Sequence, residues 1–225
     1  MGACKIFKRF LTIVIKMLNI CWLKTLIFNL AYFPYKTAFK LPVYIYRNVK
    51  LMSLNGEIKI TSDIKRGMIR IGQYDVGTLD MKYERTIWQN NGIAIFDGSA
   101  CVGSGSRLSI NSGAILQLGD GFCITGRSTL ICQKRICFGT NCLLSWDILI
   151  MDTDFHKITN NANTVINDPK PIIVGNNVWI GCRNTILKGV TVANNVIIAA
   201  GSIITKDISE PNTVVTGGEV WSKSY

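Results

Sequence analysis

The stretch that decides the fold is PIIVGNNVWIGCRNTILKGVTVANNVIIAAGSIITKDI, residues 171–208. Aliphatic side chains return in it at every sixth position, at Val174, Ile180, Ile186, Val192, Ile198 and Ile204. A second set stands two residues earlier and is mostly smaller or β-branched: Ile172, Val178, Asn184, Val190, Val196 and Ser202. Gly and Asn residues, which tolerate turns, lie between the two sets. Neither a helix nor a hairpin sheet has a six-residue period, so the pattern predicts a coil of short strands.

The same six-residue phase continues upstream of this stretch. It runs through Phe96, Val102, Leu108, Leu118, Ile124, Leu130, Phe138, Leu144 and Ile150, with small insertions. Three hexads make one coil of about 18 residues, so the chain winds as a three-sided prism whose faces stack strand on strand. We therefore predict an all-β domain, a β-helix of about five coils, over residues 96–216. Residues 51–95 are expected to be extended chain with a partial coil, and residues 217–225 a C-terminal tail.

The basic residues of the chain are concentrated in its N-terminal part. The protein carries a net charge of +11, from 25 Lys and Arg against 14 Asp and Glu. Nine of these basic residues and none of the acidic ones fall within residues 1–56, so the remainder is nearly balanced. The excess of positive charge must therefore be explained by the N-terminal part of the chain. No nucleic-acid partner is expected, because no aromatic platform accompanies the basic residues.

The N-terminal segment, residues 1–50, has the pattern of an amphipathic helix. Its polar stripe follows helical spacing: Lys5, Lys8, Arg9, Thr12, Lys16 and Asn19. Apolar residues lie away from that stripe: Phe7, Phe10, Leu11, Val14, Leu18, Cys21 and Trp22. We expect peripheral contact with an anionic membrane through residues 1–30. A membrane span would bury Lys16 and Lys24, and no signal-peptide cleavage site follows. The alternative is a helix pair packed on the protein's own body.

Eight cysteines and a single histidine bear on metal binding and on the redox environment. The cysteines, at positions 4, 21, 101, 123, 132, 137, 142 and 182, form no C-x-x-C pair. A zinc site would need cysteines alone at irregular spacing, so no metal is expected. Without a signal peptide, the cysteines are interpreted as reduced thiols in a cytoplasmic protein.

The repeat is interrupted once, after Ile150, and resumes only at Val174. The intervening residues, 151–173, are too polar for a coil and predict a loop that projects from the prism. This loop carries the histidine, His156, close to Asp152 and Asp154. An imidazole, with an ordinary pKa near 6.5, can accept a proton and return it within one turnover, so His156 is a candidate general base. For Asp152 and Asp154 the alternative to a catalytic role is a structural one, in which their carboxylates cap turns of the loop.

Three motifs accompany the hexads: MDTDFH at residues 151–156, VWIG at 178–181 and AAGSIITK at 199–206. Together they resemble the hexapeptide-repeat acyltransferases, and more closely the branch of bacterial sugar and polysaccharide O-acetyltransferases. The resemblance implies a left-handed parallel β-helix, an exception to the usual right-handed crossover. It also implies acetyl-CoA as cosubstrate and homotrimers with each active site in the groove between neighbouring prisms.

The resemblance also assigns roles in a direct transfer without an acyl-enzyme. His156 would remove the proton from an acceptor hydroxyl as that oxygen attacks the thioester. Asp152 would orient the imidazole, with Asp154 as the second candidate. A backbone N–H near Gly181 or Cys182 would stabilise the oxyanion.

Six residues are expected to bind acetyl-CoA: Trp179, Gly181, Cys182, Ala200, Thr205 and Lys206. Trp179 would flank the cleft near the thioester, and Lys206 would meet a CoA phosphate. The alternatives are burial of Trp179 against a neighbouring subunit and a solvated Lys206. Family members often end the repeat with a basic residue that meets CoA, whereas this chain ends in TGGEVWSKSY, which leaves the role of Lys223 open.

The sequence favours an O-acetyltransferase acting on a sugar or a lipid-linked oligosaccharide, peripheral at the inner face of the bacterial cytoplasmic membrane. An acyltransferase acting on serine or an amino sugar would share the prism and the histidine. A non-catalytic β-helix scaffold is the third alternative.

Overall fold

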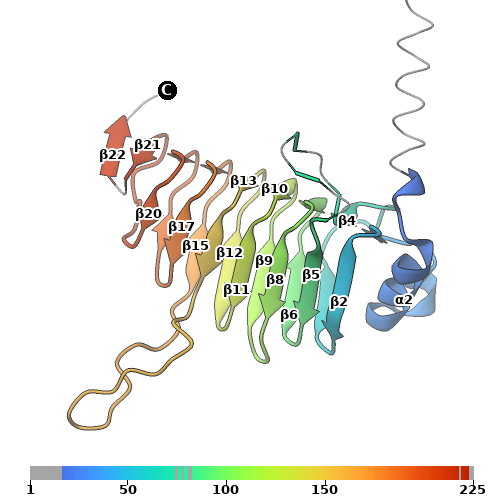
Figure 1. The fold of residues 1–225 in the computed structure, drawn as a ribbon, viewed down its shortest axis with the longest axis horizontal. Coiled ribbons are helices and arrows are strands. Elements are labelled where there is room, and N and C mark those ends of the chain that lie inside the picture. The colour runs from blue at the N-terminus through green and yellow to red at the C-terminus, as the bar shows by residue number, and fades with distance from the viewer. Residues whose placement is uncertain (1–16, 74–75, 78, 81–82, 218, 223–225) are drawn as a thin grey trace, which may run out of the picture.

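The computed structural model describes residues 17–73, 76–77, 79–80, 83–217 and 219–222. From Val43 onward the chain winds as a three-sided coil whose faces are three parallel sheets (Figure 1). The predicted fold class, a left-handed parallel β-helix, is confirmed. Strand pairing is parallel throughout the three sheets, apart from the antiparallel pair β21 and β22 at the C-terminal end.

Each sheet is named here by its first strand. The nine-stranded β1 sheet contains β1 (Val43–Ile45), β4 (Ile69–Ile71), β7 (Ala100–Val102), β10 (Phe122–Gly126), β13 (Leu143–Trp146), β16 (Trp179–Ile180), β19 (Ile197–Ile198), β21 (Val214–Thr216) and β22 (Glu219–Ser222). The seven-stranded β2 sheet contains β2 (Val49–Leu54), β5 (Thr86–Asn90), β8 (Arg107–Ile110), β11 (Thr129–Cys132), β14 (Leu149–Met151), β17 (Thr185–Leu187) and β20 (Ile203–Ile204). The six-stranded β3 sheet contains β3 (Glu57–Ile60), β6 (Ile93–Phe96), β9 (Ile115–Leu118), β12 (Arg135–Phe138), β15 (Ile172–Val174) and β18 (Thr191–Val192).

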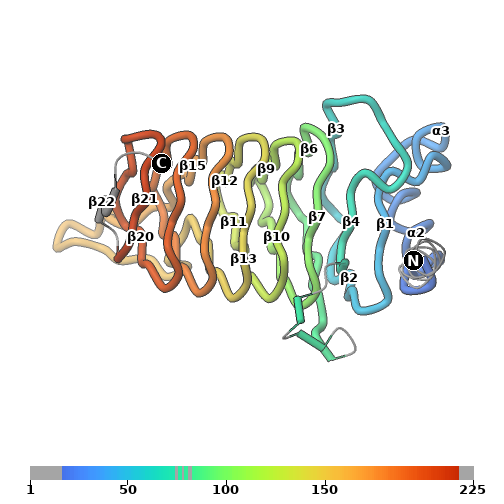
Figure 2. Tube along the Cα trace, turned by 90° about the horizontal axis from the view of Figure 1, so that it is seen from above, coloured from blue at the N-terminus to red at the C-terminus, as the bar shows by residue number. Residues whose placement is uncertain are grey.

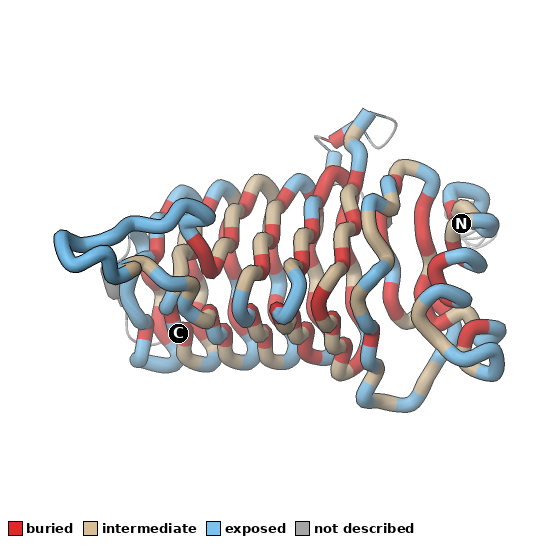
Figure 3. Tube along the Cα trace, turned by 90° about the horizontal axis from the view of Figure 1, so that it is seen from below, coloured by how far each residue is buried: buried red, intermediate tan, exposed pale blue. Residues whose placement is uncertain are grey.

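The interior of the prism is filled by the hexad residues. Every aliphatic or aromatic residue of the predicted six-residue phase, from Phe96 to Ile204, is buried. Burial of such a side chain contributes roughly 1.5–3 kcal/mol each, so the stacked rows are the main source of stability. Two polar residues of the later hexads, Asn184 and Ser202, are also buried and are satisfied locally: the Asn184 amide donates to the Gly181 carbonyl, and its oxygen accepts the Ser202 N–H at 2.6 Å. The alternation of buried and exposed positions along each coil is visible in Figure 3.

One corner of the coil, where the chain passes from the β3 sheet to the β1 sheet, is built by asparagines. Asn141, Asn177, Asn195 and Asn212 all have positive φ angles, between 54° and 57°. Their side chains form a ladder from coil to coil: Asn177 donates to Asn195, and Asn195 to Asn212, at 2.9 Å in both cases. Asparagine is among the few residues that tolerate this backbone conformation, which explains its recurrence at the corner.

The β-helix starts earlier than the sequence analysis placed it. The seven strands of the β2 sheet mark seven coils, and the first two of these, from Val43 to Phe96, lie before the predicted start at residue 96. Residues 68–72 (MIRIG) contain β4 of the second coil. The period is hidden there because long connections separate the strands and the register of β2 against β5 shifts between Leu51 and Ser53.

Two helices, α2 (Trp22–Tyr32) and α3 (Tyr35–Ala38), cover the N-terminal end of the coil (Figure 2). They correspond to the alternative of a helix pair packed on the protein's own body. Most of the predicted basic stripe, from Lys5 to Lys16, lies outside the described residues. Lys223 lies outside them as well.

Helix α2 protects the exposed edge of the first strand with two buried polar side chains. The Asn29 amide donates to the Val43 carbonyl at 2.8 Å and accepts the Val43 N–H at 3.2 Å. The Thr25 hydroxyl accepts the Ile45 N–H at 3.0 Å. An unpaired strand edge invites pairing with other chains, so this helix ends the stack of coils.

The opposite face of α2 is apolar and exposed. Leu23, Leu26, Ile27 and Leu30 are between 38% and 69% exposed. Within the described part of the chain, no helix has the length and apolar character needed to cross a membrane.

Candidate active site

The predicted loop leaves the edge between the β2 and β3 sheets, after β14, and returns to β15. It projects away from the prism and is exposed along most of its length (Figures 1 and 3). Its two limbs pair locally, with the Ile166 N–H donating to the Ile158 carbonyl at 2.9 Å and the Asn160 N–H to the Thr164 carbonyl at 3.0 Å. The loop is therefore an ordered excursion from the fifth coil.

Asp152 anchors the base of this loop. Its carboxylate is fully buried and accepts three successive backbone N–H groups, from Gln133 at 2.7 Å, Lys134 at 2.8 Å and Arg135 at 2.7 Å. These donors are the two residues between β11 and β12 and the first residue of β12, one coil below. The Asp152 carbonyl accepts the Lys170 N–H at 3.1 Å, which ties the two ends of the loop together. This geometry is that of loop capping, the alternative to the orienting role predicted for Asp152.

Asp154 braces the loop against the next coil. Its carboxylate forms an ion pair with the ammonium of Lys188, which follows β17, and accepts the Asn167 amide at 3.0 Å. The Lys188 ammonium also donates to the Asn167 carbonyl at 2.7 Å. The hydrogen bond from Lys188, followed by that from Asn167, holds the pKa of the Asp154 carboxyl below its ordinary value. Asp154 is therefore charged at neutral pH, and protonation would weaken the brace only in acid.

His156 is exposed and lines a cavity of about 230 Å³ between the loop and the turn before β12. Its backbone is fixed on both sides: the His156 N–H donates to the Asp154 carbonyl at 2.7 Å, and its carbonyl accepts the Asn167 amide at 2.8 Å. No hydrogen bond recorded for the described residues ends on the imidazole ring. The ring is thus presented to the outside by a braced backbone, and neither predicted aspartate is shown bonded to it.

Asn167 and Lys188 were not among the residues predicted from the sequence. Asn167 connects three parts of the loop, since its side chain bonds Asp154 and the His156 carbonyl and accepts the Ile158 N–H at 2.7 Å. The available signal was weak: an asparagine on the return limb of an asparagine-rich loop. Lys188 could have been noticed as a lysine one coil beyond the loop, directly after the strand that stacks on β14.

Trp179 lies on the outer face of the β1 sheet. Its register partners on the neighbouring strands are Leu143 and Ile197, so an apolar row runs along this face. The indole is 47% exposed and its N–H donates to the Ser145 hydroxyl at 3.3 Å. An exposed tryptophan in an apolar row is suited to contact a ligand or another chain.

Gly181, Cys182 and Ala200 gather at the edge between the β1 and β2 sheets. A Cβ on Gly181 would lie 2.7 Å from the Ala200 nitrogen, so only glycine allows the two coils to approach this closely. The Gly181 N–H donates to the Ile198 carbonyl at 2.8 Å, which excludes it as an oxyanion donor in this conformation. The Cys182 N–H, in contrast, donates no hydrogen bond to any of the described residues.

Thr205 and Lys206 are exposed and lie at the opposite edge of the β2 sheet. Lys206 follows β20 as Lys188 follows β17, so both lie on the edge from which the loop departs. The residues predicted to bind acetyl-CoA thus form two groups, one at each edge of the β2 sheet. The two groups are separated by the length of one strand, on the order of 10 Å.

The described cysteines are free thiols. Burial raises the pKa of Cys142 to about 11 and also raises that of Cys132, so neither thiol is reactive at neutral pH. In the part of the chain that the structure describes, no three His, Cys, Asp or Glu side chains gather as a metal site.

Comparison with known proteins supports the predicted resemblance. Residues 171–206 match the family model of the bacterial transferase hexapeptide (six repeats), which confirms the hexads in the stretch that decides the fold. A polysialic acid O-acetyltransferase from Neisseria meningitidis is 34% identical over 103 residues, which are 45% of this chain and 48% of that protein. The chain therefore matches about half the length of this curated relative.

Solved structures of similar proteins include the polysialic acid O-acetyltransferase OatWY, at 24% identity and a TM-score of 0.45, over 78% of this chain and 67% of that one. A hexapeptide-repeat-containing acetyltransferase from Vibrio cholerae is 22% identical with a TM-score of 0.46, over 55% of this chain and 68% of that one.

Proposed function

We propose that this protein transfers an acetyl group from acetyl-CoA to a hydroxyl group of a sugar in a cell-surface polysaccharide. The observation that carries the proposal is the braced loop of residues 152–170, which interrupts a hexapeptide coil to present the chain's only histidine. The relative from Neisseria meningitidis, named for polysialic acid O-acetylation, supports the reaction class.

In the proposed reaction the neutral His156 imidazole removes the proton from the acceptor hydroxyl. The hydroxyl oxygen attacks the thioester carbon, and the carbonyl becomes an oxyanion, for which the Cys182 N–H is the candidate donor. The intermediate collapses with cleavage of the carbon–sulfur bond, and the imidazolium returns its proton to the CoA thiolate. Asp154, Asn167 and Lys188 hold the backbone on either side of His156, so they act as positioning residues rather than proton carriers.

A second copy of the chain completes this site in our proposal. His156 projects from the edge between the β2 and β3 sheets, whereas Trp179 lies on the β1 face of the same prism. The loop also exposes apolar side chains, with Phe155 at 59%, Ile158 at 54% and Ile166 at 60%. Exposed apolar residues on a projecting loop indicate a surface that another chain covers. A homotrimer, in which this loop meets the Trp179 face of a neighbour, satisfies both observations.

The residues predicted to bind acetyl-CoA are compatible with the proposed trimer. Trp179, Cys182 and Ala200 would lie along one side of the seam, near the thioester. Thr205 and Lys206, on the far edge of the β2 sheet, are exposed and free to receive the cosubstrate of the adjoining seam, where the Lys206 ammonium would pair with a phosphate. We further propose that the acceptor is a lipid-linked intermediate at the inner face of the cytoplasmic membrane.

The test is incubation of the full chain with acetyl-CoA and two acceptors, a soluble acidic oligosaccharide and extracted lipid-linked oligosaccharides. We expect release of the CoA thiol and a product heavier by one acetyl group that is lost on mild alkaline treatment, as an O-ester is. An alkali-stable product would favour the amine acyltransferase. Failure of CoA to raise the melting temperature would favour the scaffold and contradict the proposal.

A further inference from the structure

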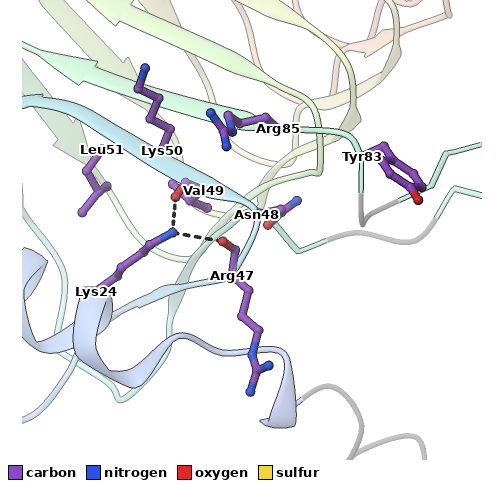
Figure 4. A pocket seen from close by; sticks show the side chains of 8 residues that line it. All are labelled: Lys24, Arg47, Asn48, Val49, Lys50, Leu51, Tyr83 and Arg85. Atoms are coloured by element: carbon purple, nitrogen blue, oxygen red, sulfur yellow. Dashed lines mark hydrogen bonds between the residues drawn. The ribbon is translucent and has the colours of Figure 1, made fainter.

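A cavity of about 730 Å³ lies at the N-terminal end of the coil and is shown from close by in Figure 4. It is lined by Lys24, Arg47, Asn48, Val49, Lys50, Leu51, Tyr83 and Arg85. Four of these residues are basic and none is acidic. The first strand of the β2 sheet and the residue just before β5 supply half of the lining: Val49, Lys50, Leu51 and Arg85.

Within the described part of the chain, no carboxylate forms an ion pair with the basic groups of this pocket. Among the ion pairs of the described residues, none involves Arg47, Lys50 or Arg85, and all three side chains are exposed. Glu84, which precedes Arg85, is engaged elsewhere, 3.7 Å from the Arg127 guanidinium. The pocket therefore keeps an uncompensated positive charge, as an anion-binding site requires.

Lys24 joins this pocket rigidly to α2. Its ammonium donates to the carbonyl oxygens of Arg47 at 3.0 Å and Val49 at 2.6 Å, as Figure 4 shows. The helix and the basic strand thus form one unit. The other side of the helix presents the exposed apolar residues Leu23, Leu26, Ile27 and Leu30, at positions i, i+3, i+4 and i+7.

We propose that this end of the molecule docks on an anionic phospholipid bilayer. The apolar face of α2 enters the boundary between headgroups and acyl chains, and the pocket takes a headgroup phosphate. An arginine guanidinium matches phosphate oxygens bidentately, and Arg47 and Arg85 line the pocket from two different strand connections. The inference extends the proposed function, because a lipid-linked acceptor would be presented at such a surface.

Charge favours a membrane over a second copy of the chain as the partner that covers this end of the molecule. The first 56 residues contain nine basic residues and no acidic one, and the remainder of the chain has no comparable acidic excess. Two copies that met through this end would repel one another, whereas an anionic bilayer complements both the charge and the apolar helix face.

The test is flotation of the full chain with vesicles of phosphatidylcholine alone and of phosphatidylcholine with phosphatidylglycerol, in the absence of acetyl-CoA. We expect binding only to the anionic vesicles. The triple variant Arg47→Gln, Lys50→Gln and Arg85→Gln should bind about 100-fold more weakly, since each basic group near an anionic surface contributes about fivefold. The double variant Ile27→Ser and Leu30→Ser should weaken binding as well, with limited loss of packing, because the two residues are 48% and 38% exposed.

The matched control is the triple variant Arg107→Gln, Lys134→Gln and Arg135→Gln, which removes the same charge from exposed positions on later coils. An equal loss of binding in this control would overturn the proposal, as would equal binding to neutral vesicles. Pocket-dependent binding of inorganic phosphate or of the soluble acidic oligosaccharide, without vesicle binding, would assign the pocket to a soluble anion instead. Vesicle binding and acetyl transfer are scored separately, so the failure of one proposal does not imply that of the other.

Discussion

Replacing His156 with alanine is expected to lower kcat for acetyl transfer by about 10²–10⁴-fold, the usual contribution of a positioned general base. The melting temperature should not change, because the side chain is exposed and its ring takes part in no recorded hydrogen bond of the described residues. The measurement is CoA thiol release under saturating acetyl-CoA and acceptor, together with thermal unfolding of both proteins.

The matched control for His156→Ala is Asn161→Ala, at an exposed position farther along the same loop. It should retain activity within about twofold, since it is outside the hydrogen bonds that brace His156. A His156→Ala protein that turns over as fast as the parent would contradict the proposed base. A protein with both activity and thermal stability lost would instead place His156 in the structure of the loop.

The substitution Asp152→Ala is expected to destabilise the fold by about 3 kcal/mol, since three backbone N–H donors of the turn below would lose a charged acceptor in a buried site. The loop would also lose its attachment, so activity should fall together with stability. Urea unfolding measures the first effect, through a lower midpoint at unchanged slope, and CoA thiol release measures the second.

The control for Asp152→Ala is Asp154→Asn, which removes an ion pair at a carboxyl that is 45% exposed. Such a pair contributes within about 1 kcal/mol, so the unfolding midpoint should move little. If Asp152→Ala left stability intact and lowered only kcat, the orienting role predicted from the sequence would be restored and the anchoring role would be wrong.

Much of the fold could be predicted from the sequence because the six-residue period is a direct consequence of the coil. Each hexad contributes two buried side chains, one from the row Val174 to Ile204 and one two residues earlier, and neither a helix nor a hairpin sheet repeats in this way. The first two coils could not be phased, since long connections and the shifted register near Leu51 erase the period. The packing of α2 on the body could not be predicted, because it depends on Thr25 and Asn29, whose polar side chains pair with a strand edge that no local pattern reveals.

The candidate site was predictable in its location but not in its hydrogen bonds. A polar interruption with a single histidine identified the loop, and the structure places His156 on it, exposed and braced. Proximity in sequence made Asp152 a plausible partner of the imidazole, but its carboxylate turns inward to the coil below. Asn167 and Lys188 approach the histidine from the return limb and from the next coil, and such contacts follow from stacking, which a linear motif does not encode.

The central claim is that one copy supplies the histidine and its neighbour the tryptophan face. The direct measurement is the acetyltransferase activity of mixed oligomers, formed by coexpressing a His156→Ala chain with a Trp179→Ala chain. Each variant alone should be nearly inactive. Mixed trimers should regain about one third of the parent activity, since one of their three seams joins an intact loop to an intact face. No recovery in verified mixed trimers, or full activity in a monomer, would contradict the account.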